Sequence, residues 1–143
     1  MERVVEALAG ELSAATLYRI LGLRSQVFVV EQSCVYLDPD GRDLEGTTRH
    51  LWIEDGVDGD VVACARVLAE DEGCSIGRVV TAVAHRSRGH GGELVQAALA
   101  RAPRPVRINA QSHLVDWYAQ LGFAVDGAEF VEDGIAHTPM VVA

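Results

Sequence analysis

The chain has 143 residues, and its 12 arginines and lysines against 21 aspartates and glutamates give a net charge of −9. A chain of this length buries roughly 68–70% of its unfolded surface, enough for one core, so we expect a single domain over residues 1–143. The acidic balance argues against nucleic acid as a partner, because phosphate binding needs clustered cations. No apolar run approaches the ~20 residues that cross a bilayer, which argues against a membrane.

The N-terminus and the cysteines predict a cytoplasmic location. The opening residues, MERVVE, carry acidic side chains where a secretory leader has a basic and then an apolar stretch. Cys34, Cys64 and Cys74 are too scattered for a disulfide framework, and we expect them to be small buried hydrophobes. A nucleophilic role for Cys34 is the alternative, but it has no histidine close in sequence. All 12 cations are arginine, so no lysine amine is present to form a Schiff base.

Hydrophobic periodicity predicts one strand, one helix and three further strands in the N-terminal half. Ser13 is a helix N-cap residue, and apolar side chains at helical spacing follow it to a helix end near Glu31. Residues 33–46 are polar and contain a Pro-Asp-Gly turn, so we expect a loop. The predicted strands are residues 3–8 at a sheet edge, 48–54 and 60–69 around a turn at 55–59, and 75–81 as a buried central strand.

The C-terminal half predicts two helices with one strand between them, followed by a hairpin. The first helix follows a glycine-rich turn at residues 86–92 and ends at Pro103. The second has Ser112 as its N-cap and ends at Gly122. The remaining strands are residues 106–110, and 123–131 with 136–142 around an Asp133-Gly134 turn. This element order predicts a mixed sheet with helices packed on it, an α/β or α+β fold.

The glycine-rich turn is the strongest chemical signal in the sequence. Its residues, Arg-Ser-Arg-Gly-His-Gly-Gly over 86–92, stand between a strand and a helix. Glycines allow a sharp turn with several N–H groups close to a ligand, and the helix N-terminus adds positive potential, so we expect a phosphate or pyrophosphate site. The turn lacks the Gly-Lys-Ser/Thr of a P-loop, and Leu94 replaces the third glycine of the dinucleotide fingerprint. The alternative is a tight turn with solvated arginines.

Two motifs together resemble the GNAT superfamily of N-acyltransferases. Arg86-x-x-Gly89-x-Gly91 is similar to that family's loop for the coenzyme A pyrophosphate, and Tyr118-x-x-x-Gly122-Phe123 is similar to its later Tyr-x-x-x-Gly-Phe segment. Further runs resemble the ElaA-type branch: residues 23–32, Thr48-Arg49-His50, Ile76-Gly77-Arg78-Val79, Ala110-Gln111-Ser112-His113 and residues 132–137. Ser87 and Val83 depart from residues common in such loops, Gly and Pro, but neither removes a backbone donor.

The resemblance implies the fold and the reaction. The expected fold is a GNAT-like, mostly antiparallel central sheet of about seven strands, splayed between two central strands and flanked by three to four helices. The expected reaction is transfer of an acetyl or other short acyl group from acetyl-CoA (coenzyme A) to a primary amine, by direct attack and without a metal. The acceptor would be a small-molecule or peptide amine, and the resemblance also allows a homodimer.

The resemblance also assigns site residues. The expected coenzyme A-binding residues are Val79, Val80, Thr81, Arg86, Ser87, Arg88, Gly89, His90, Gly91, Gly92 and Asn109. A strand N–H near Val79 or Val80 would stabilise the oxyanion. Tyr118 stands at the position of the general acid that protonates the leaving thiolate, with a core aromatic as the alternative.

The general base is ambiguous at this stage. Glu31, His50, His113 and His137 all lie in the family-like runs. Glu31 and His50 are preferred, because the helix end and the following strand flank the acceptor cleft in this fold. Each histidine has a hydrogen-bonded structural role as its alternative reading.

Three further readings stay open. The eight acidic residues between positions 38 and 60 are candidates to hold a cationic acceptor or simply to form a solvated loop; their spacing does not fit a calcium loop. The chain could be a catalytically silent acyl-CoA-binding module that acts on a protein partner. The spacing of Arg24, Phe28, Glu31, Asp40 and Asp43 also resembles acyl-homoserine lactone synthases, although those chains are usually longer.

Overall fold

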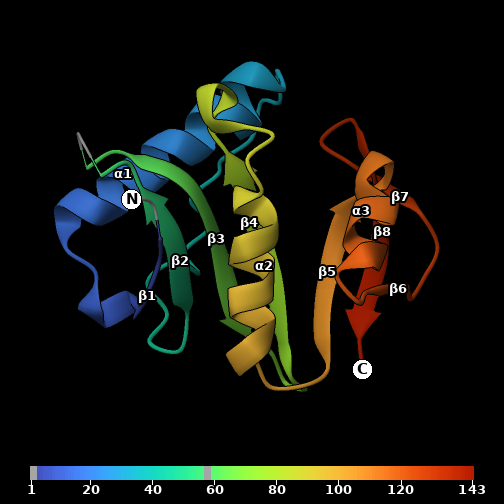
Figure 1. The fold of residues 1–143 in the computed structure, drawn as a ribbon. Helices are drawn as coiled ribbons and strands as arrows, with labels where there is room; N and C mark the ends of the chain where they lie inside the picture. The colour runs from blue at the N-terminus through green and yellow to red at the C-terminus, as the bar shows by residue number, and fades with distance from the viewer. Residues whose placement is uncertain (1–2, 57–58) are drawn as a thin grey trace.

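Within residues 3–56 and 59–143, which the computed structural model describes, the chain forms one eight-stranded sheet with α-helices on both faces (Figure 1). The strand order is β1-β2-β3-β4-β5-β8-β6, and β7 pairs with β8. The strands are β1 (Val4–Leu8), β2 (Arg49–Glu54), β3 (Val61–Ala69), β4 (Cys74–Thr81), β5 (Val106–Gln111), β6 (Ala124–Val125), β7 (Phe130–Glu132) and β8 (Ile135–Val142). The helices are α1 (Ala14–Arg24), the π-helix η2 (Ser25–Glu31), α2 (His90–Arg101), α3 (Val115–Gln120), and the 3-10 turns η1 (Ala9–Glu11), η3 (Val83–His85) and η4 (Ser112–Leu114).

The sheet opens between its two central strands. β4 and β5 are parallel and pair only at Cys74 with Val106 and at Ser75 with Arg107. Beyond these pairs the strands diverge, and Figure 1 shows β4 and β5 close at one end and well separated at the other. The other strand pairs are antiparallel. The mostly antiparallel, splayed sheet predicted above is therefore confirmed.

Side chains on the two faces of the sheet build two separate cores. Along β3, Ala63 and Ala65 lie in the core under α2 and α3, whereas Cys64 between them lies in the core under α1. This alternation follows from the two-residue period of a strand. The α1 core contains Ile20 and Trp52. Because both faces are covered, β3 is buried along almost its whole length.

Most predicted elements are confirmed, with three differences. Ser13 caps α1 by accepting a hydrogen bond from the Thr16 N–H, but the helix widens into η2 before it ends at Glu31. Ser112 does not cap a helix: its hydroxyl bonds Thr138 at 2.8 Å, and η4 precedes α3. The first arm of the last hairpin is divided into β6 and β7, which gives eight strands instead of about seven. Residues 57 and 58 of the turn predicted at 55–59 lie outside the described residues.

Three arginines and three aspartates form a charge cluster that fixes the loop between η2 and β2, with Arg24, Arg66, Asp38 and Asp43 buried and with Arg78 and Asp40 nearer the surface. Arg24 bonds Asp38 at 2.9 Å and Asp43 at 2.6 Å. Arg66 bonds Asp40 and Asp43, and Arg78 bonds Asp38 at 2.8 Å. The three guanidinium and three carboxylate charges cancel. The loop is polar, as predicted, but it is held by ion pairs instead of being freely solvated.

The cluster gives a stability prediction. Replacing Arg24 by Met leaves Asp38 with Arg78 and Asp43 with Arg66 as their remaining cations, and losing one partner of a buried pair costs about 3–5 kcal/mol. Arg42 pairs with Glu45 and Glu70 on the surface, so Arg42→Met is the matched control and should cost about 0–1 kcal/mol. Urea denaturation measures both. Equal losses in the two variants would show that the cluster does not stabilise the fold.

Candidate active site

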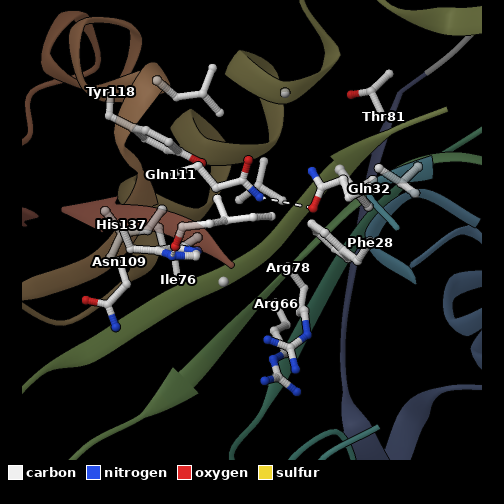
Figure 2. Close-up of a pocket in the computed structure, with 18 of the residues that line it drawn as sticks. Phe28, Gln32, Arg66, Ile76, Arg78, Thr81, Asn109, Gln111, Tyr118 and His137 are labelled. Carbon is white, nitrogen blue, oxygen red and sulfur yellow. Dashed lines mark hydrogen bonds between the residues drawn. The ribbon is translucent and has the colours of Figure 1, made fainter. Parts of the chain in front are cut away.

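A cleft of about 1190 Å³ lies where the sheet opens. Its lining comes from β4, β5, β8, α3, η2 and the loop before α2. Figure 2 shows Tyr118, His137 and Asn109 on one wall and Phe28 and Gln32 on the other. The Gln111 side-chain amide donates to the Gln32 side-chain oxygen at 3.3 Å, which joins the two walls across the opening (Figure 2). The volume is large enough for two substrates of ordinary size.

The loop before α2 has the backbone geometry of an anion site. Ser87 and Gly89 have φ of 66° and 83°, and Gly89 is the residue before the first turn of α2. Within the described part of the chain, the backbone N–H groups of Ser87, Gly89, Gly91 and Gly92 donate to no backbone carbonyl. α2 is 12 residues long, so its N-terminal potential adds to these open donors. Ser87, Gly89, Gly91 and Gly92 line the cleft, as the sequence predicted for a pyrophosphate loop.

The charged side chains of this loop are arranged differently from the sequence expectation. Arg86 forms a bidentate ion pair with Glu31 across the cleft, with both N–O distances at 2.7 Å. The hydrogen bonds from Arg86 lower the pKa of the Glu31 carboxyl. A lowered pKa makes Glu31 a weaker base, which does not favour the role predicted for it. Arg88 lies 3.5 Å from His85, and the His90 ring is turned inward, buried and 3.7 Å from Glu93.

β4 carries a bulge at the point where the cleft is deepest in the sheet. Cys64 faces Val80 and Arg66 faces Gly77, so Ala65 is opposite both Arg78 and Val79. Arg78 has φ of 53°, a left-handed conformation that costs a non-glycine residue about 1–2 kcal/mol. Its guanidinium bonds both the carboxylate and the carbonyl of Asp38, which holds this conformation. A bulge leaves one residue outside the ladder.

The donor groups predicted on β4 border the opening. Val79 and Thr81 line the cleft, and Val80, although it also lines it, packs mainly against the α1 core. The Thr81 carbonyl accepts a hydrogen bond from Arg86 Nε at 3.0 Å. Since β5 pairs with β4 only at Cys74 and Ser75, the edge of β4 that faces β5 has open backbone groups from there onward.

Tyr118 lies at the opening on the α3 side. Its ring packs edge-on against Trp117 and Phe123, at centroid distances of 4.8 and 5.8 Å. Burial raises the pKa of the Tyr118 phenol to about 12. Among the described residues, no side-chain or backbone group is hydrogen-bonded to the Tyr118 hydroxyl. A buried phenol that stays protonated and lines a cleft is suited to donating a proton.

The structure shows which of the histidines considered as general base lie at the cleft. His50 is 1% exposed, donates from Nε2 to the Asp43 carbonyl at 2.9 Å, and lies outside the cleft lining. Burial lowers its pKa and keeps the ring neutral. The structure therefore does not bring His50 to the site, whatever its expected role. His113 and His137 do line the cleft, as does Asn109.

Other expectations are changed by the same geometry. Three of the acidic residues considered for a cationic acceptor, Asp38, Asp40 and Asp43, are bound to arginines in the charge cluster.

Cys34, Cys64 and Cys74 are buried free thiols, as predicted, and burial raises the pKa of Cys64 to about 12. Among the cleft residues that were given no role from the sequence are Phe28, Gln32, Arg78 and Gln111, although each stands in a family-like run.

Comparison with known proteins decides the family. Residues 40–143 match the model of the acetyltransferase (GNAT) domain. The chain belongs to the GNAT family. The UPF0039 protein Rv2851c of Mycobacterium tuberculosis is 47% identical over 138 residues, with 93% of this chain and 88% of the relative covered. Protein ElaA of Escherichia coli is 40% identical over 140 residues, covering 91% and 89%.

Solved structures agree with this placement. An acyl-CoA N-acyltransferase from Pseudomonas aeruginosa has a TM-score of 0.92 at 35% identity, and Escherichia coli ElaA has 0.92 at 37%, each over 100% of both chains. The acyl-homoserine lactone synthase BjaI has a TM-score of 0.80 at 16% identity over 99% of this chain and 83% of its own, which shows the fold alone. The spacing of Arg24, Asp40 and Asp43 that resembled such synthases is explained by the charge cluster.

Two further findings concern possible membrane-spanning helices and possible metal ligands in the described part of the chain. In residues 3–56 and 59–143, no helix combines the length and apolar character that a bilayer crossing requires. The same described residues contain no group of three or more His, Cys, Asp or Glu side chains placed to hold a metal ion.

The Glu31–Arg86 pair gives a pH prediction. The folded pKa of Glu31 is depressed, because the Arg86 cation favours the carboxylate, so replacing Arg86 by Gln should raise that pKa toward its ordinary value of 4.5. Carbon-13 NMR of the glutamate carboxyl groups measures this titration. Arg88→Gln is the matched control, since Arg88 contacts His85 and not Glu31. An unchanged Glu31 titration in Arg86→Gln would contradict the pairing.

Proposed function

We propose that the protein is an N-acyltransferase that moves an acetyl or other short acyl group from acyl-CoA to a primary amine in a ternary complex. The observation that carries the proposal is a sheet opening bordered by a glycine-rich loop in which, among the described residues, the N–H groups of Ser87, Gly89, Gly91 and Gly92 donate to no backbone carbonyl. The opening would admit an extended thioester arm, and the loop would bind its diphosphate. The GNAT match and the acyl-CoA N-acyltransferase of similar fold support the same chemistry.

The residues present fit a coenzyme A thioester on the α2 side of the sheet. The N–H groups of residues 87–92 are positioned for the diphosphate, and the open edge of β4 can donate to the arm and to the thioester oxygen. Gly91 lies beside the Trp117 ring: a Cβ at this position would stand 3.4 Å from that ring, so a large side chain there would have to displace the ring or project over the loop. Arg86 would have to exchange some of its contact with Glu31 for a phosphate oxygen.

Tyr118 is proposed as the general acid. The acceptor nitrogen forms a C–N bond to the acyl carbon, the C–S bond breaks, and the electron pair stays on sulfur. Tyr118 donates its phenolic proton to that sulfur and is reprotonated from water. A pKa of about 12 keeps the phenol protonated at neutral pH. A backbone N–H of the bulge near Val79 is proposed to stabilise the oxyanion.

Other expectations stand as proposals of the same kind. Five features stay predictions: the acetyl group, a cytoplasmic location, a small-molecule or peptide amine as acceptor, a homodimer, and the absence of nucleic-acid and membrane partners. One domain would carry both substrate sites. The silent acyl-CoA-binding module remains the competing hypothesis, and thiol release with any amine at ordinary enzyme rates would exclude it.

Binding of acetyl-CoA tests the loop directly. In a calorimetric titration the wild type should bind both acetyl-CoA and CoA. Gly91→Trp fills the loop surface and should weaken both by at least about tenfold, or about 1.4 kcal/mol. Gly22→Trp is the matched control, because Gly22 is an exposed helical glycine with open space around its Cβ position. A wild type that binds neither compound would overturn the proposed function.

Tyr118→Phe tests the general acid. The phenyl ring keeps the packing against Trp117 and Phe123, so folding should change little. Thiol release from acetyl-CoA, measured with the fastest amine of a panel, should fall by about 10²–10⁴-fold in kcat. Tyr18→Phe, at an 81% exposed tyrosine, is the control and should be unaffected. Unchanged turnover of Tyr118→Phe at every pH would remove Tyr118 from the chemistry.

A further inference from the structure

The residues on the β5 side of the opening come from both faces of the sheet. In β5, Val106, Ile108 and Ala110 point into the core under α2 and α3, so Asn109 and Gln111 point to the opposite face. His137 in β8 is directly opposite Gln111 in the antiparallel register and therefore lies on that same face. Tyr118 belongs to the α2 and α3 core. His137 and Tyr118 thus approach the opening from opposite sides of the sheet.

The His137 ring is held in one orientation and one tautomer. Its Nδ1 lies 2.8 Å from the Ile135 carbonyl oxygen, which can only accept, so Nδ1 carries the proton. The Phe130 ring stacks on it at a centroid distance of 5.6 Å and an interplanar angle of 19°. Nε2 of the neutral ring then keeps its lone pair. His137 lines the cleft, and Figure 2 shows it on the wall with Asn109.

The other base candidates lack this combination. Glu31 is bound in a bidentate pair to Arg86. His50 is buried outside the cleft lining, and its Nε2 already donates to a carbonyl. His113 is exposed, and among the described residues no hydrogen bond fixes its ring. His137 differs from the rest because it lines the cleft and its Nδ1 is already bonded, which leaves Nε2 as the basic nitrogen.

We infer that His137 is the general base of the transfer and that the acceptor amine binds on the face of the sheet with Gln111, Gln32 and Phe28. This inference rests on the proposed function. His137 Nε2 takes one proton from the acceptor ammonium, and the neutral nitrogen then forms the C–N bond and loses its second proton to water. The C–S electron pair leaves with sulfur, which receives the Tyr118 proton. The imidazolium releases its proton to water, so protons and charge balance over the cycle.

Charged and titratable groups lie on the elements around His137 and along the rest of the cleft. Around His137 they include Glu132 and Asp133 on β7 and its turn, His113 on η4, Tyr118 on α3 and Arg78 on β4, with Glu31 and Arg86 across the cleft. The rest of the cleft lining adds Cys34, Tyr36, Asp40, Arg42, Arg66, Glu70, His85, His90 and Arg107. Glu31 titrates below the range of an imidazole and Tyr118 above it. His85, His90 and His113 line the cleft together with His137, so substitution of each residue, not the position of an acid limb in the pH profile, identifies the base.

The first test needs no activity. Nitrogen-15 NMR of the intact protein should show His137 with its proton on Nδ1, whereas free imidazole side chains favour Nε2. His137→Gln identifies the resonance by its loss. A proton on Nε2 in the neutral protein would overturn the inference, and it would do so even if acetyl-CoA binds as proposed.

The second test is kinetic, with acetyl-CoA and the fastest amine of the panel. His137→Gln should lower kcat by about 10²–10⁴-fold and remove the acid limb of the pH profile. Acetyl-CoA affinity should stay unchanged, because His137 lies on the other face of the sheet from the loop. Methoxyamine, which is already unprotonated at neutral pH, should be used nearly as well by the variant as by the wild type.

His113→Gln is the matched control, since it makes the same substitution at another histidine of the cleft. It should keep the acid limb. If His137→Gln keeps the turnover and the acid limb, or loses activity equally with methoxyamine and alkyl amines, the base role is wrong. If the wild type binds acetyl-CoA and no amine releases thiol, both the proposed function and the base role are overturned. If acetyl-CoA does not bind, the proposed function fails by itself, and the tautomer measurement still decides the geometry.

Discussion

The parallel contact between β4 and β5 extends over only two residue pairs, and the site depends on its ending there. A continuous sheet would pair every backbone group of these central strands and leave no path from one face to the other. Because the strands separate after Ser75 and Arg107, the edge of β4 is open within the same cleft that the loop before α2 lines. The loss of ladder hydrogen bonds is offset elsewhere, since β3–β4 and β5–β8 are long antiparallel pairs.

The charge cluster maintains this opening from the α1 side. Arg78 occupies a left-handed backbone position at the bulge, and its guanidinium is bound to Asp38, which is also bound to Arg24. The loop between η2 and β2, the helix α1 and the bulge are thus joined through one carboxylate. Asp38 is 2% exposed, so these ion pairs are poorly screened by solvent. A cost of about 1–2 kcal/mol at Arg78 is acceptable when the surrounding contacts determine the conformation.

Short-range structural features can be predicted from this sequence, whereas contacts between residues far apart in the chain cannot. The Ser13 cap, the Gly122 helix end and the Asp133-Gly134 turn are short-range features, and they were predicted correctly. Ser112 has the residue type of an N-cap, but a partner 26 positions away, Thr138, takes its hydroxyl. The bulge at Arg78 could not be seen, because the left-handed position carries arginine in place of the glycine that usually marks it. The charge cluster, which joins residues 24 to 78, has no local pattern.

The same difference between short-range features and long-range contacts applies to the candidate site. The glycine loop and Tyr118 were identifiable because they are contiguous motifs, and the resemblance to a family assigned their roles. The choice among Glu31, His50, His113 and His137 depends on which side chains are already bound to something else. Arg86 is 55 positions from Glu31 and Asp43 is bound by His50 through a backbone carbonyl, so neither pairing has a sequence signature. Burial and competing partners, which only the fold supplies, separate four otherwise similar residues.

Two contacts across the cleft link the halves that the splay separates. The Gln32–Gln111 hydrogen bond and the Glu31–Arg86 ion pair both start at the end of η2, on adjacent residues, and reach β5 and the loop before α2 respectively. A diphosphate on the loop would compete with Glu31 for Arg86, and an acceptor on the far face would compete with Gln32 for Gln111. Because η2 continues α1, which packs on β3 and β4, binding on either side would act on the same helical segment. The geometry thus allows each substrate to alter the wall that the other one contacts, a coupling that requires no movement of the sheet itself.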